Sequence, residues 1–275
     1  MMEPFGSFAP PAWRQRLICL AQSMPVSWAG RRLALVLRKI ALFGAADIFD
    51  LRIEGLNWRL RMKDNVSERK FAFMPQFFDP FERWLLRQRL KPGDVFVDVG
   101  ANAGVYSLIG AASVGAAGRV LAIEPNISVL SRLRENATLN GFEKIIAVEN
   151  AGVSGREGVF DLTIDAQNLG GSSLVEARGG QVISVPCFPL LSLLQKRGIE
   201  KIDAMKLDIE GAEDIALMPF LAAAPKALYP RLLILENSPA CWRGDLPAAL
   251  KGAGFALVKT TRMNQVWELK SSAAA

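Results

Sequence analysis

An acidic residue followed by two spaced glycines, in the first half of the chain, could bind a nucleotide-like ligand. The apolar run Val95–Val99 is typical of a buried strand, and it carries Asp98 just before the chain reaches Gly100 and Gly104. Glycine permits a sharp turn and a close approach of the backbone to a ligand because it has no Cβ. An apolar helical pattern follows, and a helix that starts here would direct free amide groups at the same point. The sequence therefore predicts a nucleotide-binding turn.

The spacing of the glycines indicates which ligand this turn would take. A dinucleotide-binding fingerprint has three glycines, whereas this chain has Asn102 where the second would stand. An acidic residue before the turn suits the ammonium and sulfonium groups of S-adenosylmethionine better than it suits phosphates. We therefore expect S-adenosylmethionine rather than a nicotinamide dinucleotide, with Asp98, Gly100, Asn102 and Gly104 as cofactor-binding residues.

A second acidic residue strengthens this prediction. Arg119–Ile123 is typical of a short buried strand, and it ends at Glu124, 24 residues after Gly100. A carboxylate near this spacing accepts hydrogen bonds from the ribose hydroxyls of a bound nucleoside. The alternative is that Asp98 and Glu124 are simply polar residues at strand ends. Their placement on both sides of one turn favours the binding role.

Four blocks of sequence resemble the FkbM family of S-adenosylmethionine-dependent methyltransferases. The blocks are Asp98–Gly104, Glu124-Pro125, Asn150–Ser154 and Lys206–Glu213. The resemblance implies a Rossmann-like class I methyltransferase fold, with Asn150 and Ala151 as cofactor-binding residues beside the adenine. It also implies a small-molecule or glycan acceptor, methylated on a hydroxyl oxygen of a saccharide, glycolipid or polyketide-like metabolite. The family usually has a Leu-Asp pair where this chain has Cys187–Leu190, which we interpret as a lost helix cap without effect on the chemistry.

The chain contains no histidine, which limits how an acceptor hydroxyl could lose its proton. A protein base would have to be a carboxylate, a lysine with a lowered pKa or a tyrosine. Asp208 and Glu210 are the first catalytic candidates and Lys206 is the next. Lys206 could instead pair with a carboxylate, and Asp208, Glu210 and Glu213 could merely cap the first turn of the following helix. Without any base, alignment of the reactants would supply most of the acceleration.

Three alternatives remain open. Asp208 with Glu236 and Asn237 could hold a magnesium ion, as in catechol-type methyltransferases, although simple polar strand ends are favoured. An N-methyltransferase is less favoured, because those enzymes typically have Pro-Pro-aromatic where this chain has Ile209–Gly211. A non-catalytic nucleotide-binding or scaffold protein would keep the fold and use its basic N-terminus for interaction. Such a protein would tolerate loss of the strand-end carboxylates, and their presence counts against it.

The elements that must position these residues alternate as strands and helices, which predicts an α/β fold with a doubly wound, mostly parallel sheet. The expected core strands are Val95–Val99, Arg119–Ile123, Ile145–Val148, Ile202–Leu207 and Leu232–Leu235. Ligands bind at the carboxyl ends of such strands. We therefore expect one rim that carries Asp98, Glu124, Asn150, Asp208 and Glu236.

Three further segments surround this sheet. Phe255–Lys259 and Gln265–Leu269 predict a C-terminal antiparallel hairpin. Val159–Ile164 and Val182–Pro186 predict an inserted strand pair joined by a loop at 170–173, and residues 172–174 could close over the cofactor. Aromatic residues between 77 and 84 could roof an acceptor pocket, although ordinary core packing is favoured.

Charge divides the chain near residue 70. Residues 1–70 carry 12 basic and 6 acidic side chains, whereas residues 71–275 carry 21 of each. We therefore expect a basic N-terminal extension over residues 1–70, containing a helix and a hairpin, and a methyltransferase domain over residues 71–270.

An apolar helical pattern with basic edges occupies residues 31–44. This helix could lie on an anionic membrane surface, or, as we favour, cap the catalytic domain with a solvated basic rim. Nucleic acid is not favoured because no base-stacking motif is evident. Three distant cysteines indicate a reducing compartment, and no apolar run is long enough to span a bilayer. We therefore expect a cytoplasmic protein whose only membrane contact would be peripheral.

Overall fold

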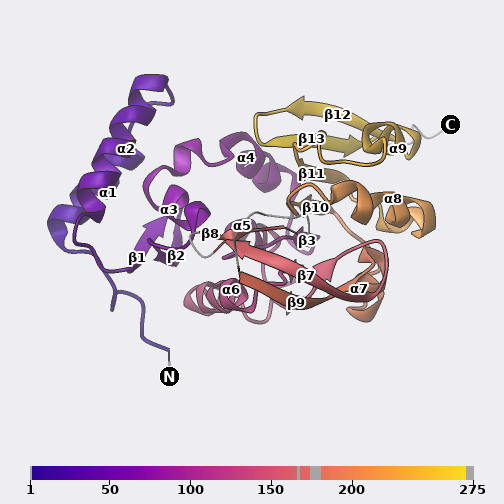
Figure 1. Cartoon of the computed structure of the whole chain (residues 1–275), viewed down its shortest axis with the longest axis horizontal. Helices are drawn as coiled ribbons and strands as arrows, with labels where there is room; N and C mark the ends of the chain where they lie inside the picture. Colours follow the sequence, from indigo (N-terminus) through magenta and orange to yellow (C-terminus); the bar gives the residue numbers. More distant parts are fainter. Residues whose placement is uncertain (1, 166–167, 174–180, 271–275) are drawn as a thin grey trace.

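The computed structural model describes residues 2–165, 168–173 and 181–270. Within them, a central sheet contains β3 Val95–Val99, β4 Arg119–Ile123, β5 Ile146–Glu149, β10 Ala204–Leu207, β11 Leu232–Glu236, β12 Phe255–Thr260 and β13 Asn264–Leu269. The strand order is β12-β13-β11-β10-β3-β4-β5. The strands from β11 to β5 run parallel, and β13 and β12 add the antiparallel hairpin (Figure 1). The α/β fold expected from the sequence, mostly parallel with a C-terminal hairpin, is confirmed.

Helices cover both faces of this sheet because successive strand residues point to opposite sides. The helices are α4 Pro80–Arg89, α5 Val105–Val114 and α6 Ile127–Leu139 on one face, and α7 Leu190–Lys196, α8 Glu213–Ala223 and α9 Leu246–Gly252 on the other. Phe96 belongs to the core on the α5 side, whereas Val97 and Val99 belong to the core on the α7 side. Asp98 alternates with these two valines, and it therefore projects toward α5.

A second, smaller sheet follows β5. It contains β6 Gly152–Val153, β7 Gly158–Asp165, β8 Asn168–Ser173 and β9 Gln181–Phe188, in the order β6-β9-β7-β8. The expected pairing of β7 with β9 is confirmed, and the two strands run antiparallel. The expected loop at 170–173 is wrong, because these residues belong to β8 and pair with the edge of β7. A glycine-rich stretch gives little strand signal, and the pairing partner supplies the order instead. Residue 174 lies outside the described residues, so its closure over a cofactor stays a prediction.

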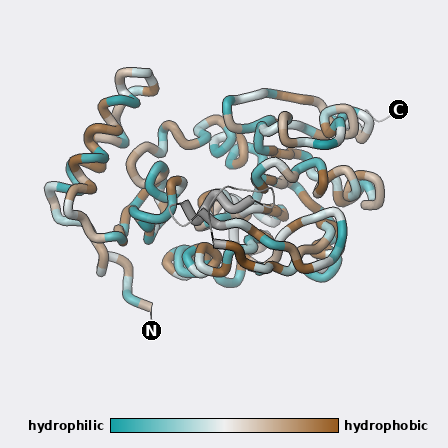
Figure 2. The backbone as a smooth tube through the Cα atoms, in the orientation of Figure 1, coloured by the Kyte–Doolittle hydropathy of each residue, from teal (hydrophilic) through white to brown (hydrophobic). Residues whose placement is uncertain are grey.

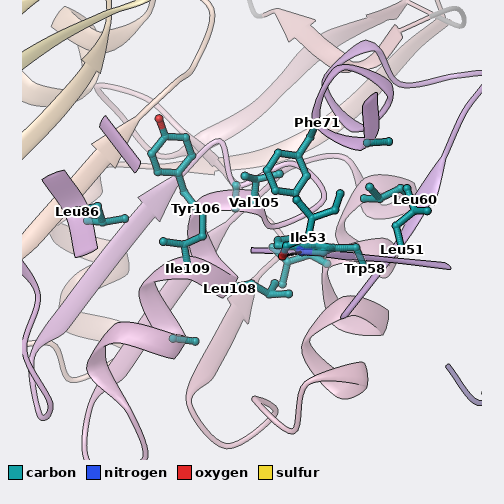
Figure 3. Packing of buried hydrophobic residues seen from close by; sticks show 14 of the residues in the cluster. Leu51, Ile53, Trp58, Leu60, Phe71, Leu86, Val105, Tyr106, Leu108 and Ile109 are labelled. Atoms are coloured by element: carbon teal, nitrogen blue, oxygen red, sulfur yellow. Dashed lines mark hydrogen bonds between the residues drawn. The ribbon is translucent and has the colours of Figure 1, made fainter. Parts of the chain in front are cut away.

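An N-terminal hairpin and a short helix pack onto the α5 side of the sheet. They are β1 Ile48–Ile53, β2 Leu56–Arg61 and α3 Val66–Phe73. The buried Trp58 ring lies 4.9 Å from the Phe71 ring, and its indole nitrogen donates to the Ile53 carbonyl oxygen at 3.1 Å. Leu108 and Ile109 of α5 belong to the same core (Figure 3). This core and helix α3 both cross residue 70, and the division into an extension and a domain there stays a prediction.

A buried arginine joins the same hairpin to the N-terminal residues and to helix α6. Arg59 and Asp50 are almost fully buried, and the guanidinium donates to both Asp50 carboxylate oxygens at 2.8 and 2.9 Å. Arg59 also donates to Glu135 of α6 at 3.0 Å and to the carbonyl oxygens of Glu3 and Pro4. A buried charge is tolerated when its hydrogen bonds are met in this way. Arg59 therefore fixes the start of the chain and the hairpin against α6.

Two helices, α1 Ala12–Gln22 and α2 Trp28–Leu42, form a pair at the end of the molecule opposite the C-terminal hairpin (Figure 1). The expected basic helix is α2. Its buried side contains Gly30, Ala34, Leu37 and Ala41, and α1 is its main packing partner. Helix α2 therefore packs on α1 and not on the central sheet. Helix α1 in turn packs on α3. None of the described helices combines the length and apolar character needed to cross a bilayer.

Replacing Trp58 by alanine should destabilise the protein by about 3 to 5 kcal/mol, because it removes a fully buried ring from the shared core. Trp84→Ala is the matched control, since that ring is 54% exposed and its loss should cost far less. Urea denaturation followed by circular dichroism measures both changes. Equal losses of stability would contradict the packing role given to Trp58.

Candidate functional site

The corner after β3 is built around Gly100. Its backbone has φ of +75°, and its amide donates to the Ile123 carbonyl oxygen at 2.9 Å. A Cβ on this residue would lie 1.9 Å from the carbonyl oxygen of Asp208, which no real side chain permits. Only glycine therefore lets the corner after β3 meet the chain after β10.

Gly104 has a packing role in addition to the binding role expected of it. It is the N-cap of α5 with φ of +95°, and an added Cβ would lie 2.9 Å from both Leu108 and Leu133 side chains. Gly104 is not among the pocket-lining residues of the described structure. Glycine is therefore needed here for packing against α6, and contact of its backbone with the cofactor stays a prediction.

Asp98 is held at the floor of a pocket formed at this corner. Its side chain is buried, and the Ser107 hydroxyl of α5 donates to its Oδ2 at 2.6 Å. Its Oδ1 is buried and has no hydrogen-bond partner within the described part of the chain. Burial raises the pKa of Asp98, while the positive charge of Lys206 opposes that shift. Asp98 lines the pocket, and a carboxylate with one unused oxygen can accept a further hydrogen bond.

Glu124, at the end of β4, is oriented by two backbone amides. Asn102 donates to its Oε2 and Asn126 to its Oε1, both at 2.9 Å. Burial raises the pKa of Glu124 to about 7 despite these hydrogen bonds. Asn102 itself has φ of +50° and receives a hydrogen bond from Asn65 at 2.8 Å. The corner and the acidic residue therefore form one unit, and both line the pocket.

Lys206 lies beside Asp98 because the two are register partners in the parallel pair β10 and β3. Its ammonium donates to Asp208 Oδ2 at 2.7 Å and lies 4.7 Å from the centre of the Tyr106 ring. Burial acts to lower the pKa of Lys206, but the carboxylates of Asp208 and Asp98 outweigh it and the pKa is raised. The ion-pair interpretation of Lys206 is therefore favoured over a role as a base, which would need a lowered pKa.

The loop after β10 supplies the other two catalytic candidates. Asp208 and Glu210 both line the pocket, and Glu210 has φ of +56°. Burial, followed by the charges of Asp208 and Glu236, raises the pKa of Glu210 to about 8. The helix-capping alternative fits Glu213 instead, because its carboxylate accepts from the amides of Ile209 and Gly211.

Of the two residues expected beside the adenine, only Ala151 lines the pocket. Asn150 is exposed, and its side-chain amide donates to the carbonyl oxygens of Glu124 at 3.1 Å and Pro125 at 2.8 Å. Asn150 thus fixes the turn after β4. The structure places it on the rim but not in the pocket.

Several pocket-lining residues escaped the sequence analysis. They are Ser67, Glu68, Tyr106, Leu162, Val185 and Met263. Leu162 and Val185 come from the smaller sheet and give the pocket an apolar wall. The Tyr106 hydroxyl donates to Asp79 at 3.2 Å, and burial raises the pKa of Tyr106 well above its usual range, which disfavours this phenol as a base. Phe78 confirms that one aromatic residue of the 77–84 stretch reaches the pocket.

A magnesium ion would need free oxygen ligands from the side chains at the ends of β10 and β11. Glu236 lines the pocket, and burial followed by the charge of Asp208 raises its pKa to about 7. Asn237 is engaged elsewhere, because its amide nitrogen donates to Thr261 and its oxygen accepts from Gln265. Within the described residues, no group of three His, Cys, Asp or Glu side chains is arranged to hold a metal ion.

A mostly parallel sheet with a glycine corner after one strand and an acidic residue after the next is the arrangement of a class I methyltransferase. Comparison with known proteins gives the family. A family model described as the methyltransferase FkbM domain matches residues 98–273, and the chain therefore belongs to the FkbM methyltransferase family. The resemblance inferred from the sequence is confirmed.

Three individual proteins illustrate the relationship. The 31-O-demethyl-FK506 methyltransferase FkbM of Streptomyces tacrolimicus is 28% identical in an alignment of 230 residues that covers 70% of this chain and 84% of that protein. The crystal structure of methyltransferase FkbM from Methylobacillus flagellatus is 18% identical with a TM-score of 0.43, covering 75% of this chain and 55% of that one. An O-methyltransferase structure from Thermotoga maritima is 13% identical with a TM-score of 0.44, covering 85% and 81%.

Gly100→Ala should destabilise the protein by more than the roughly 1 to 2 kcal/mol that a left-handed backbone costs a residue with a Cβ, because the methyl group would also meet the Asp208 carbonyl. Gly55→Ala separates the two effects. That glycine has φ of +83° with nothing within 4 Å of its added Cβ. Urea denaturation of both variants measures the difference, and equal losses would argue against the close contact.

Proposed function

We propose that the pocket binds S-adenosylmethionine and transfers its methyl group to a hydroxyl oxygen of a small-molecule or glycan acceptor. The observation that carries the cofactor proposal is the charge of the pocket. Six carboxylates line it, from Glu68, Asp98, Glu124, Asp208, Glu210 and Glu236, and Lys206 is its only cation among the described residues. A pocket of this sign suits a sulfonium and an ammonium group and repels a pyrophosphate.

Two of these carboxylates fit the cofactor's hydrogen-bonding groups. The unused Oδ1 of Asp98 is suited to the ammonium of the methionine part. Glu124 is fixed by two amides and retains lone pairs on both oxygens, which suits two neighbouring ribose hydroxyls. Gly100, Asn102 and Ala151 would contact the rest of the cofactor. S-adenosylmethionine would supply an activated methyl group, and these residues would bind and orient the cofactor.

Oxygen as the acceptor atom is supported by family membership and by the name of the Streptomyces relative, which describes an O-demethyl compound as its substrate. The transfer requires the acceptor oxygen, the methyl carbon and the sulfur to lie in line, and the hydroxyl proton must leave. Glu210 is our candidate for the proton acceptor, because it lines the pocket near Asp208 and has a raised pKa. Lys206 is proposed to position Asp208 through their ion pair.

Asp98→Asn and Glu124→Gln should each weaken S-adenosylmethionine affinity by about 1 to 3 kcal/mol, because each removes a buried ionic acceptor. Glu149→Gln is the matched control, since Glu149 ends β5 and pairs with Lys196 instead of lining the pocket. Calorimetry with S-adenosylmethionine, S-adenosylhomocysteine and NAD measures the affinity of each of the three variants for each ligand. Unchanged affinity in both pocket variants, or tighter binding of NAD, would refute the cofactor assignment.

Turnover should rise as pH is raised through about 8, because Glu210 must lose its proton to act as a base and burial raises its pKa to about 8. Glu210→Gln should lower kcat by roughly a hundredfold or more, abolish this pH dependence and weaken cofactor affinity less than Asp98→Asn does. Release of S-adenosylhomocysteine with hydroxylated acceptors provides the assay, and mass spectrometry locates the methyl group. Glu236→Gln is the control. Loss of the pH dependence in that variant alone would transfer the role to Glu236.

A further inference from the structure

We propose that the N-terminal helical pair, α1 and α2, docks on the surface of an anionic phospholipid bilayer. Four half-exposed or exposed apolar side chains follow one side of α2 and the residue after it. Leu33, Val36, Ile40 and Phe43 are 48%, 53%, 50% and 85% exposed. Their spacing of three, four and three residues places them in one row, about a quarter-turn from the buried stripe that contacts α1. α2 therefore has two apolar sides, and α1 covers only one.

Aromatic and basic side chains stand together at both ends of this row. Trp28 begins α2 and is exposed, and the Arg32 guanidinium lies 5.5 Å from the centre of its ring. Trp13 of α1 is also exposed, and the Arg14 guanidinium lies 4.8 Å from its ring. Arg14 further donates to the Phe43 carbonyl oxygen at 2.9 Å, which joins this end of α1 to the end of the row. Tryptophan and arginine of this kind combine an apolar body with a polar group and favour a lipid–water interface.

The charge of the pair identifies the surface it would meet. Between Pro4 and Ala46 the chain has six basic and no acidic residues. Arg31, Arg32 and Lys39 are exposed on α2, and within the described structure none of them forms an ion pair with a carboxylate. Figure 2 shows hydrophilic and apolar residues interleaved along these helices. An apolar row beside unpaired basic groups is complementary to a bilayer surface that carries phosphate charges.

A second copy of the chain is a poorer occupant for the same row. In a symmetric dimer each copy presents the same patch to the other, so the basic residues of one α2 would face those of its partner. An anionic surface removes that repulsion and buries the same apolar side chains. Docking requires no part of the proposed methyl transfer, and its test is independent of cofactor and acceptor.

Flotation of the full chain with vesicles of phosphatidylcholine, alone or mixed with phosphatidylglycerol, tests the proposal. We expect binding only to the mixed vesicles, and weaker binding as salt is raised. Arg31→Gln with Arg32→Gln should lower the partition constant by about 25-fold, at roughly fivefold per arginine. Val36→Ser with Ile40→Ser should lower it by roughly tenfold or more, because these side chains would no longer enter the interface.

Matched controls lie at the other end of the molecule. Leu257→Ser with Val258→Ser removes two half-exposed apolar side chains from β12, and Lys226→Gln with Lys251→Gln removes two exposed charges. Both pairs should leave flotation unchanged, and circular dichroism with urea denaturation verifies that every variant is folded. Absent binding, equal binding to phosphatidylcholine vesicles, or equal losses in the control pairs would overturn the proposal. So would a dimer that Ile40→Ser dissociates while vesicle binding is absent.

Discussion

The close contact between Gly100 and the carbonyl of Asp208 is the constraint on which the rest of the site depends. It joins the corner after β3 to the loop after β10, although Gly100 and Asp208 are 108 positions apart in the sequence. The Asp208 amide also donates to the Val99 carbonyl oxygen at 3.0 Å, which fixes the same junction from the other side. Because parallel strands end at one edge of the sheet, this junction gathers the carboxylates of four strands around a single pocket.

The burial of two opposite charges side by side follows from the same sheet geometry. Lys206 and Asp98 are partners across β10 and β3, and both project toward α5, where an apolar core would otherwise be expected. Burial of such charges is costly, and it is tolerated here because Asp208, Ser107 and the Tyr106 ring contact them. One oxygen of Asp98 is still left without a partner. An acidic pocket with an unmet acceptor is poorly suited to phosphate and well suited to a cationic ligand.

The strongest sequence predictions were those in which local pattern and chemistry agreed. The strand Val95–Val99, the corner at Gly100 and the strand that leads to Glu124 all occur as expected, because each depends on neighbouring residues. What depended on distant partners could not be predicted in this way. Residues 170–173 form a strand rather than a loop because β7 offers an edge. The packing of Gly104 against Leu133 of α6, and the hydrogen bonds of Asn150 to the carbonyls of Glu124 and Pro125, likewise follow only from the tertiary structure.

The sequence by itself determined the fold class, the family and the identity of most rim carboxylates, because strand periodicity, glycine spacing and residue type are local properties. Only the tertiary structure decided the burial, the neighbouring charges and therefore the pKa of each carboxylate. Burial and neighbouring charge set the pKa of Glu124 and Glu210, and strand register placed Lys206 beside Asp98. The same holds for α2, whose apolar pattern is evident in the sequence. Its packing against α1 settled which side remains exposed, since a helix can bury only the side that a neighbour covers.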